Sequence, residues 1–186
     1  MRWIPVLFSA LLSFAVLAAP AGATHHTESK LDALFAELNR VESAAEAEPI
    51  EKEIWELWME SGDVELDSLM LFGISAMEIG NLPAALSTFD QLVAVAPDYA
   101  EAWNKRATVH YLMGNMEASI ADVAHTLNLE PRHFGALSGL GLIYVAIGND
   151  KAALKAFEKA LAANPHLHEI ENLVLRARQR LNGRGI

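Results

Sequence analysis

Apolar residues recur every three or four positions through most of the chain, which is the spacing of a helix with one buried face. One such stripe holds Leu69, Phe72 and Ala76, and the next holds Phe89 and Leu92. This spacing favours an all-α fold. It predicts a series of paired amphipathic helices over residues 66–79, 83–95, 100–113, 117–129, 134–147 and 151–163.

Glycine and proline recur between these helices at a constant interval of 34 residues. Each of three glycines is followed by asparagine, and three prolines keep the same interval: Gly80, Gly114, Gly148, Pro97, Pro131 and Pro165. Glycine can adopt the left-handed conformation that ends a helix, and proline stops the second helix of each unit. A fixed period of this length is typical of stacked structural repeats.

Three segments align without a gap when position 1 is placed at Leu66, Ala100 and Phe134. Matching positions then hold similar residues: Leu69, Trp103 and Leu137 at position 4, Gly73, Ala107 and Gly141 at position 8, Ala85, Ser119 and Ala153 at position 20, and Phe89, Val123 and Phe157 at position 24. The pattern resembles the tetratricopeptide repeat (TPR) family over residues 66–165. The resemblance implies a right-handed solenoid of helical hairpins with repeats at 66–99, 100–133 and 134–167.

Two further amphipathic segments precede the repeats, at residues 30–43 and 50–61. They predict an acidic helical hairpin within residues 24–65, which is either a degenerate repeat or a cap. Its residues Trp55 and Trp58 are better explained as core anchors than as a platform for a ligand.

The segment after the repeats, residues 166–186, has apolar side chains on one face and arginines on the other. An uncovered terminal repeat would expose apolar surface to water. We therefore expect a capping helix over residues 168–181, followed by a basic tail.

The chain begins with the features of a secretory signal peptide. Arg2 precedes a 16-residue apolar run, and Ala21-Gly22-Ala23 is a site that a signal peptidase accepts. The alternative, a retained membrane anchor, needs roughly 20 apolar residues to cross a bilayer. Residues 1–23 are thus predicted to be removed, which leaves a periplasmic protein without stable membrane insertion. The absence of cysteine excludes disulfides and a lipid-modified N-terminal cysteine.

Charge is distributed unevenly along the chain. Residues 28–67 hold 13 acidic and 3 basic side chains, whereas residues 68–186 hold 11 acidic and 10 basic ones. Nucleic-acid binding requires a concentrated basic face. We therefore expect no nucleic-acid partner, and the two charged ends are explained first as solvated surfaces.

The family resemblance also implies a concave groove lined by positions 2, 5, 9, 12 and 13 of each repeat. These positions hold Met70, Ile74, Met77, Glu78, Glu101, Asn104, Thr108, Tyr111, Leu112, Ser138, Leu142, Val145 and Ala146. Some family members hold a carboxylate there with Lys and Asn, from which this chain departs at Met70, Ile74 and Thr108. A Met- and Leu-rich groove suits an amphipathic helix or an extended apolar peptide. Alternatively, the chain's own capping elements fill it.

Arg106 occupies position 7, where Phe72 and Leu140 are expected to face the core. A guanidinium at such a position must be paired or reach water. Repeat geometry points to Asp122 and Asp90 as its partners, in a charge pair that fixes how the first two repeats dock. In the alternative interpretation, Arg106 receives an acidic group of a partner protein.

The pair Arg132 and His133 lies in the turn between the second and third repeats, beside the groove rim. Exposed turn polarity is the favoured explanation, and a ligand contact is the alternative. The histidines His110 and His125 fall on different faces, so no metal site or cofactor is expected.

Cleavage after Ala23 would free the amine of Thr24 and place His26 third, a nitrogen set suited to Cu(II) or Ni(II). This metal-handling role is a distant alternative, as is an enzymatic activity.

The favoured function is a non-enzymatic periplasmic adaptor or assembly factor that binds another protein in the groove. The second is an accessory subunit that binds through its convex face or its acidic hairpin, with the groove self-occupied.

Overall fold

The computed structural model describes residues 21–183, with side chains from residue 28, and within this range it contains helices and no strands. The helices are α1 (Ala21–Leu38), α2 (Ala44–Met59), α3 (Val64–Glu78), α4 (Leu82–Val95), α5 (Ala100–Leu112), α6 (Met116–Leu129), α7 (Phe134–Ala146), α8 (Asp150–Ala163) and α9 (His168–Gly183). Most of the predicted signal peptide, residues 1–20, lies outside the described residues, as do the side chains of Thr24 and His26.

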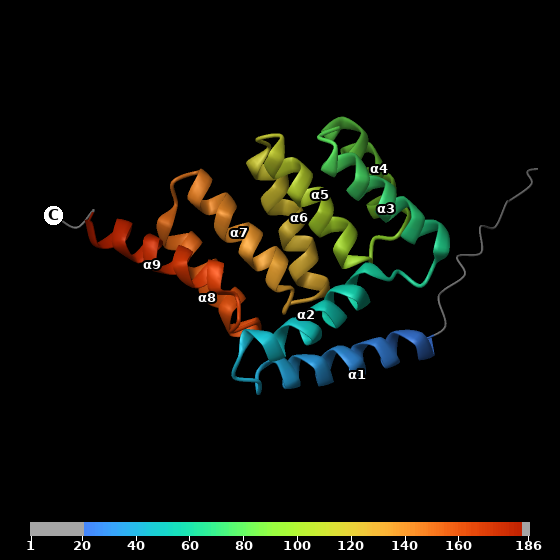
Figure 1. The fold of residues 1–186 in the computed structure, drawn as a ribbon. Helices are drawn as coiled ribbons and strands as arrows, with labels where there is room; N and C mark the ends of the chain where they lie inside the picture. Colours follow the sequence, from blue (N-terminus) through green and yellow to red (C-terminus); the bar gives the residue numbers. More distant parts are fainter. Residues whose placement is uncertain (1–20, 184–186) are drawn as a thin grey trace, which may run out of the picture.

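Helices α3 to α8 form three stacked hairpins, and α9 packs on α8 at the end of the stack (Figure 1). Each hairpin turns at a glycine with positive φ: 74° at Gly80, 80° at Gly114 and 76° at Gly148. An L side chain is strained in this conformation, which explains the glycine in every repeat. The predicted all-α helical-hairpin solenoid is confirmed.

The two helices of the first and third repeats approach closely where a glycine faces an aromatic ring. A Cβ atom on Gly73 would lie 2.6 Å from the ring of Phe89, and one on Gly141 would overlap the ring of Phe157. Both phenylalanines are fully buried. The small residue at position 8 and the large one at position 24 therefore form one packing unit.

The N-terminal hairpin begins its second helix earlier than the sequence pattern suggested. Ser43 accepts a hydrogen bond from the Glu46 amide, and the Glu46 side chain accepts one from the Ser43 amide. This capping box satisfies two amide groups at the start of α2. The sequence pattern predicted that this helix begins at residue 50, because the capping box was not recognised.

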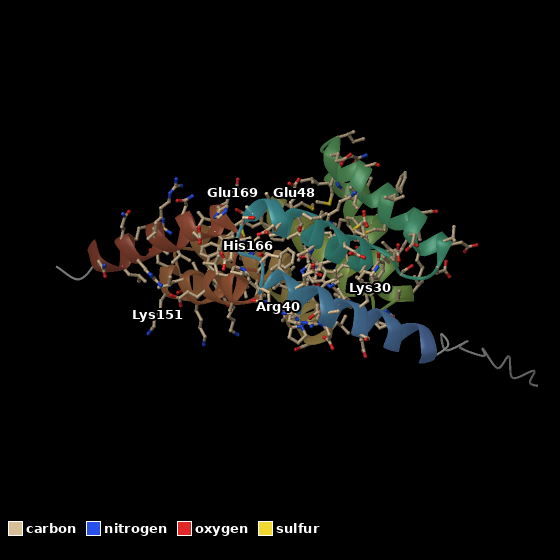
Figure 2. The ribbon with its side chains drawn as sticks, turned by 60° about the horizontal axis from the view of Figure 1, so that its bottom comes forward. Lys30, Arg40, Glu48, Lys151, His166 and Glu169 are labelled. Atoms are coloured by element: carbon tan, nitrogen blue, oxygen red, sulfur yellow. The ribbon has the colours of Figure 1, made fainter. Side chains whose placement is uncertain are left out.

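This hairpin does not stack on α3 as another repeat would. Figure 1 shows α2 running across the lower ends of α5 and α7, with α1 beside it on the outside. Turned forward in Figure 2, α1 and α2 lie side by side over the repeats. The core of the hairpin, built on residues such as Leu38 and Ile54, is continuous with Phe134 of the third repeat.

The first repeat is consequently uncovered on its outer side. Phe72 is 61% exposed, so the prediction that it faces the core is wrong, whereas Leu140 at the same position packs against a buried cluster. In the later repeats this position lies against the preceding hairpin. Helix α3 has no such neighbour, because the N-terminal hairpin crosses the repeats instead of preceding them.

Candidate binding surface on the concave face

Helices α3, α5 and α7 lie side by side and form the concave face of the solenoid (Figure 1). The predicted groove residues divide into two sets along these helices. Those near the helix N-termini, at positions 2 and 5, include fully buried Met70 and Glu101 and mostly buried Asn104. Those near the C-termini remain more exposed. We call these two parts the covered groove and the open groove.

Helix α2 occupies the covered groove through Trp55. A Cβ atom on Gly135, at position 2 of the third repeat, would lie 2.5 Å from the Trp55 ring. The ammonium of Lys105 lies 5.6 Å from the centre of the same ring. A glycine at position 2 thus lets an indole of the same chain approach the α7 backbone where a ligand would otherwise lie.

Beside it, Trp58 stacks on the imidazole of His133, with ring centres 4.0 Å apart and planes 10° apart. His133 is fully buried. Its Nδ1 accepts a hydrogen bond from the Ala136 amide, so the proton resides on Nε2, which donates to Glu101 Oε2 at 2.8 Å. The imidazole therefore connects the α7 N-terminus, α5 and α2.

Glu101 is a fully buried carboxylate with three partners. Besides His133, Asn104 Nδ2 donates to it at 3.0 Å, and Lys105 Nζ lies 2.9 Å from Oε1. Burial alone would raise the pKa of Glu101, but the hydrogen bond from His133 and the charge of Lys105 outweigh it and lower the pKa. The carboxylate is therefore held ionised beneath the hairpin.

Arg132 joins the same turn to α1. It donates to Asp32 at 2.6 Å and to Glu130 at 3.0 Å, and its guanidinium lies 4.5 Å from the ring centre of Phe35. The hydrogen bonds to Glu130 and Asp32 raise the pKa of Arg132. The expectation of exposed turn polarity is wrong for the buried His133, and Arg132 is engaged by the chain itself.

Equivalent turns at the other repeat boundaries also contact the hairpin. The Tyr99 hydroxyl donates to the Met59 carbonyl, and Asn164 donates to Glu51 at 2.8 Å. The His166 imidazole donates to the carbonyl of Leu38 at 3.1 Å; Figure 2 labels His166 beside the hairpin. The hairpin is therefore attached to both inter-repeat turns and to the turn between the third repeat and α9.

The open groove presents apolar side chains to solvent. Leu112 is 52% exposed and Leu142 37% exposed. Around them lie residues that are exposed or half-buried: Ile74, Met77, Glu78, Thr108, Tyr111, Val145 and Ala146. Ser138, at position 5, is half-buried and belongs to the covered groove. The open groove can bury apolar groups of a partner and offers hydroxyl groups at a few points.

Arg106 lies away from this surface, between α4 and α6. Its Nε and Nη2 donate to the two oxygens of Asp122 at 2.8 and 2.7 Å, and its Nη1 donates to Asp90 at 2.9 Å. Asp122 is almost fully buried, and its hydrogen bonds raise the pKa of Arg106. The geometry favours a structural link between the first two repeats.

The described histidines are dispersed. His125 stacks on Trp103, with ring centres 4.2 Å apart, and His110 lies 3.8 Å from Asp122. Within residues 21–183, counting side chains from residue 28 only, no three His, Asp or Glu side chains gather as a metal site would require. In the same range, no helix is both long and apolar enough to span a bilayer.

Comparison with known proteins identifies the family. Tetratricopeptide repeat profiles match residues 70–125 and 134–167. A TPR repeat-containing protein of Rhizobium etli is 42% identical over 150 residues, which cover 81% of this chain and 74% of the relative. The chain therefore belongs to the tetratricopeptide repeat family.

Solved structures agree with the fold. The crystal structure of MamA matches 89% of this chain and 87% of its own, with a TM-score of 0.60 and 18% identity. The first TPR of Spaghetti (RPAP3), bound to an HSP90 peptide, matches 63% of this chain and 93% of its own, with a TM-score of 0.61 and 19% identity.

Sequence reasoning missed the residues that close the covered groove. It recognised Trp55 and Trp58 as anchors but not the surface that they contact. Gly135 gave a signal, because glycine at a groove position inside a helix leaves room for a large side chain from elsewhere. Glu101 gave another, since a carboxylate within an apolar groove requires a partner.

Proposed function

We propose that this chain is a non-enzymatic protein-interaction module that holds an apolar segment of a partner protein in its open groove. The observation that carries the proposal is the exposure of Leu112 and Leu142 on neighbouring helices of the concave face. Family membership supports it, because TPR solenoids mediate protein–protein interaction. The Spaghetti domain, which is similar in fold, holds an HSP90 peptide.

The chemistry of the open groove selects the partner class. Met77, Leu112, Leu142 and Val145 offer thioether and aliphatic surface, and lysine and arginine are absent from the predicted groove positions. A peptide carboxylate therefore has no cationic partner there. An amphipathic helix, or an extended peptide with apolar side chains, can bury its apolar face against these residues.

Because α2 fills the covered groove, the ligand site is shorter than the full concave face. The covered half contributes rigidity instead of ligand contacts. Trp55, Trp58 and His133 hold the N-terminal ends of α5 and α7 in place, so that the C-terminal ends are arranged before a ligand arrives. Such preorganisation reduces the entropy that binding costs.

The proposed compartment is the periplasm. The basic and apolar segment at residues 2–19, followed by Ala21-Gly22-Ala23, supports export with removal of residues 1–23. The lack of cysteine is compatible with an oxidising compartment. Edman sequencing of the protein recovered from the periplasm tests this, and a sequence beginning at Met1 would oppose it.

Affinity capture from a periplasmic extract tests the groove. We compare the unaltered chain with Leu112→Glu and Leu142→Glu, two exposed sites where a charge leaves the fold intact but opposes an apolar partner. The matched control is Leu175→Glu, at a 56% exposed leucine on α9. Both groove variants should lose the same captured protein, and the control should keep it. Retention by both groove variants would overturn the proposal.

The second candidate is an accessory subunit that binds through the acidic hairpin. The observation that favours it is the set of exposed carboxylates on α2 and its termini, including Glu48, Glu56 and Glu60 (Figure 2 labels Glu48). Binding there depends on charge and weakens with salt. Capture that survives Leu142→Glu but is lost at high salt supports this candidate over the groove.

A further inference from the structure

The outer face of α3 carries the most exposed apolar stripe in the described part of the chain. Its four large members are Val64, Leu71, Phe72 and Ile79, which are 81%, 60%, 61% and 79% exposed. This stripe lies where a preceding repeat would pack. Contiguous apolar surface of this kind marks an interaction site on a protein that otherwise buries such residues.

The order of residues along the stripe is symmetrical about a point between Leu71 and Phe72. Outward from that point come two serines, Ser68 and Ser75, each the same number of residues away, and then Val64 and Ile79, again equally distant. With 100° of rotation per residue, all six lie within one face of α3.

We propose that this stripe binds the same stripe of a second copy, with the two α3 helices antiparallel about a two-fold axis. In that arrangement Val64 lies level with Ile79 of the other copy, and Ser68 lies level with Ser75. The two small serines allow the helices to approach, while Leu71 and Phe72 of both copies meet at the axis. A symmetric dimer requires such self-complementarity, whereas a foreign partner does not.

The charges near the stripe are compatible with this arrangement. Glu65 and Glu78 are exposed and lie at matching heights, but helical rotation places them on opposite flanks of the stripe. The pairing therefore does not bring the two carboxylates together. Apart from Glu78, which borders both surfaces, the residues of the open and covered grooves lie on other faces of α3, so the dimer leaves the proposed ligand site open.

The size of the stripe indicates a reversible dimer. Stable interfaces bury roughly 800 Å² on each partner. One helix face with four large apolar residues supplies the centre of such an interface, and its rim must come from neighbouring residues. We therefore expect the dimer to form at micromolar or higher concentration.

Disulfide trapping tests the antiparallel arrangement, because the chain has no cysteine of its own. Ser68→Cys and Ser75→Cys are prepared as separate full-length proteins, one carrying a small mass tag, and are mixed under mild oxidation. The mixed disulfide should form at least tenfold faster than either homodimer. Two Ser68→Cys residues would be separated by about seven residues of helix rise, roughly 10 Å, which is too far for a disulfide.

Two controls accompany this experiment. Leu175→Cys, on the exposed side of α9, should cross-link slowly with every variant. Phe72→Glu places two like charges beside the axis and should weaken self-association of the full chain at least tenfold in sedimentation equilibrium. Because Phe72 is exposed, helical content by circular dichroism should not change.

Two results would overturn the proposal. One is a full chain that stays monomeric up to several hundred micromolar. The other is a mixed sample that cross-links no faster than the unmixed samples, because equal rates indicate random collision and a slower mixed rate indicates parallel pairing.

Discussion

Trp58→Ala is expected to release the N-terminal hairpin while the three repeats remain folded. Trp58 is buried, stacks on His133 at 4.0 Å, and contacts Phe134 at 5.0 Å between ring centres. Truncating a buried tryptophan to alanine costs about 3–5 kcal/mol. Because the hairpin contacts the repeats mainly through this cluster and the turn residues, most of that cost falls on hairpin docking.

Amide hydrogen exchange measures the effect by region. A loss of about 3 kcal/mol raises the local opening constant on the order of 100-fold, since each 1.4 kcal/mol is a factor of ten. Amides of α1 and α2 should therefore exchange about 100-fold faster, while those of α6 and α8 should change little. Trp103→Ala is the matched control, because Trp103 stacks on His125 away from the hairpin.

Two results would refute this reasoning. Equal acceleration in all helices would mean that hairpin and repeats unfold as one unit, so that the hairpin has no separate docking equilibrium. Unchanged exchange in α2 would mean that the stacked indole contributes little to docking. A folded protein with accelerated exchange confined to α1 and α2 supports the description of the covered groove.

Three further predictions concern packing and charge. Gly141→Ala should destabilise the protein by roughly 1–3 kcal/mol in urea denaturation, because the added methyl overlaps a buried ring, whereas Gly139→Ala, where the space is open, should stabilise it by about 0.5–1 kcal/mol. Arg106→Leu should cost roughly 3 kcal/mol in the same assay by leaving Asp122 buried without its cation, and stability that stays unchanged would favour a binding role. The pKa of Glu101 is lower in the folded chain than its ordinary value of 4.5, so ionisation of this carboxyl group stabilises the fold. The contribution is complete above pH 4.5 and is lost as the pH falls through the lowered pKa. Glu101→Gln should therefore flatten the acid limb of a plot of stability against pH.

The repeats were predictable from sequence because their determinants are local. The turn at Gly114 involves residues within one hairpin and recurs with the period of 34. The packing of Gly141 under Phe157 is equally local and recurs in the first repeat as Gly73 under Phe89. The helix bounds of the repeats follow within two residues of the predicted ones. Periodicity therefore specifies both the hairpins and the way in which they stack.

The site was predictable only in part, because its closure depends on contacts between distant segments. Asp32 meets Arg132 a hundred residues later, and neither has a counterpart in the repeat pattern that would indicate the pairing. The amphipathic stripe of the hairpin shows that it is covered but not by which surface. The prediction that Phe72 is buried was wrong for a related reason. Its alignment with Leu140 assumes a preceding hairpin, which the first repeat lacks.

The attachment of the hairpin to every inter-repeat turn bears on how the solenoid responds to heat and force. In an ordinary repeat array each unit touches only its neighbours, so terminal units fray one at a time and the spiral can lengthen or tighten. Here Tyr99, His133 and His166 are bound to one helical pair that spans them. While the hairpin stays docked, the three repeats should therefore melt together and not one at a time, and the arc should keep one curvature with or without a bound ligand.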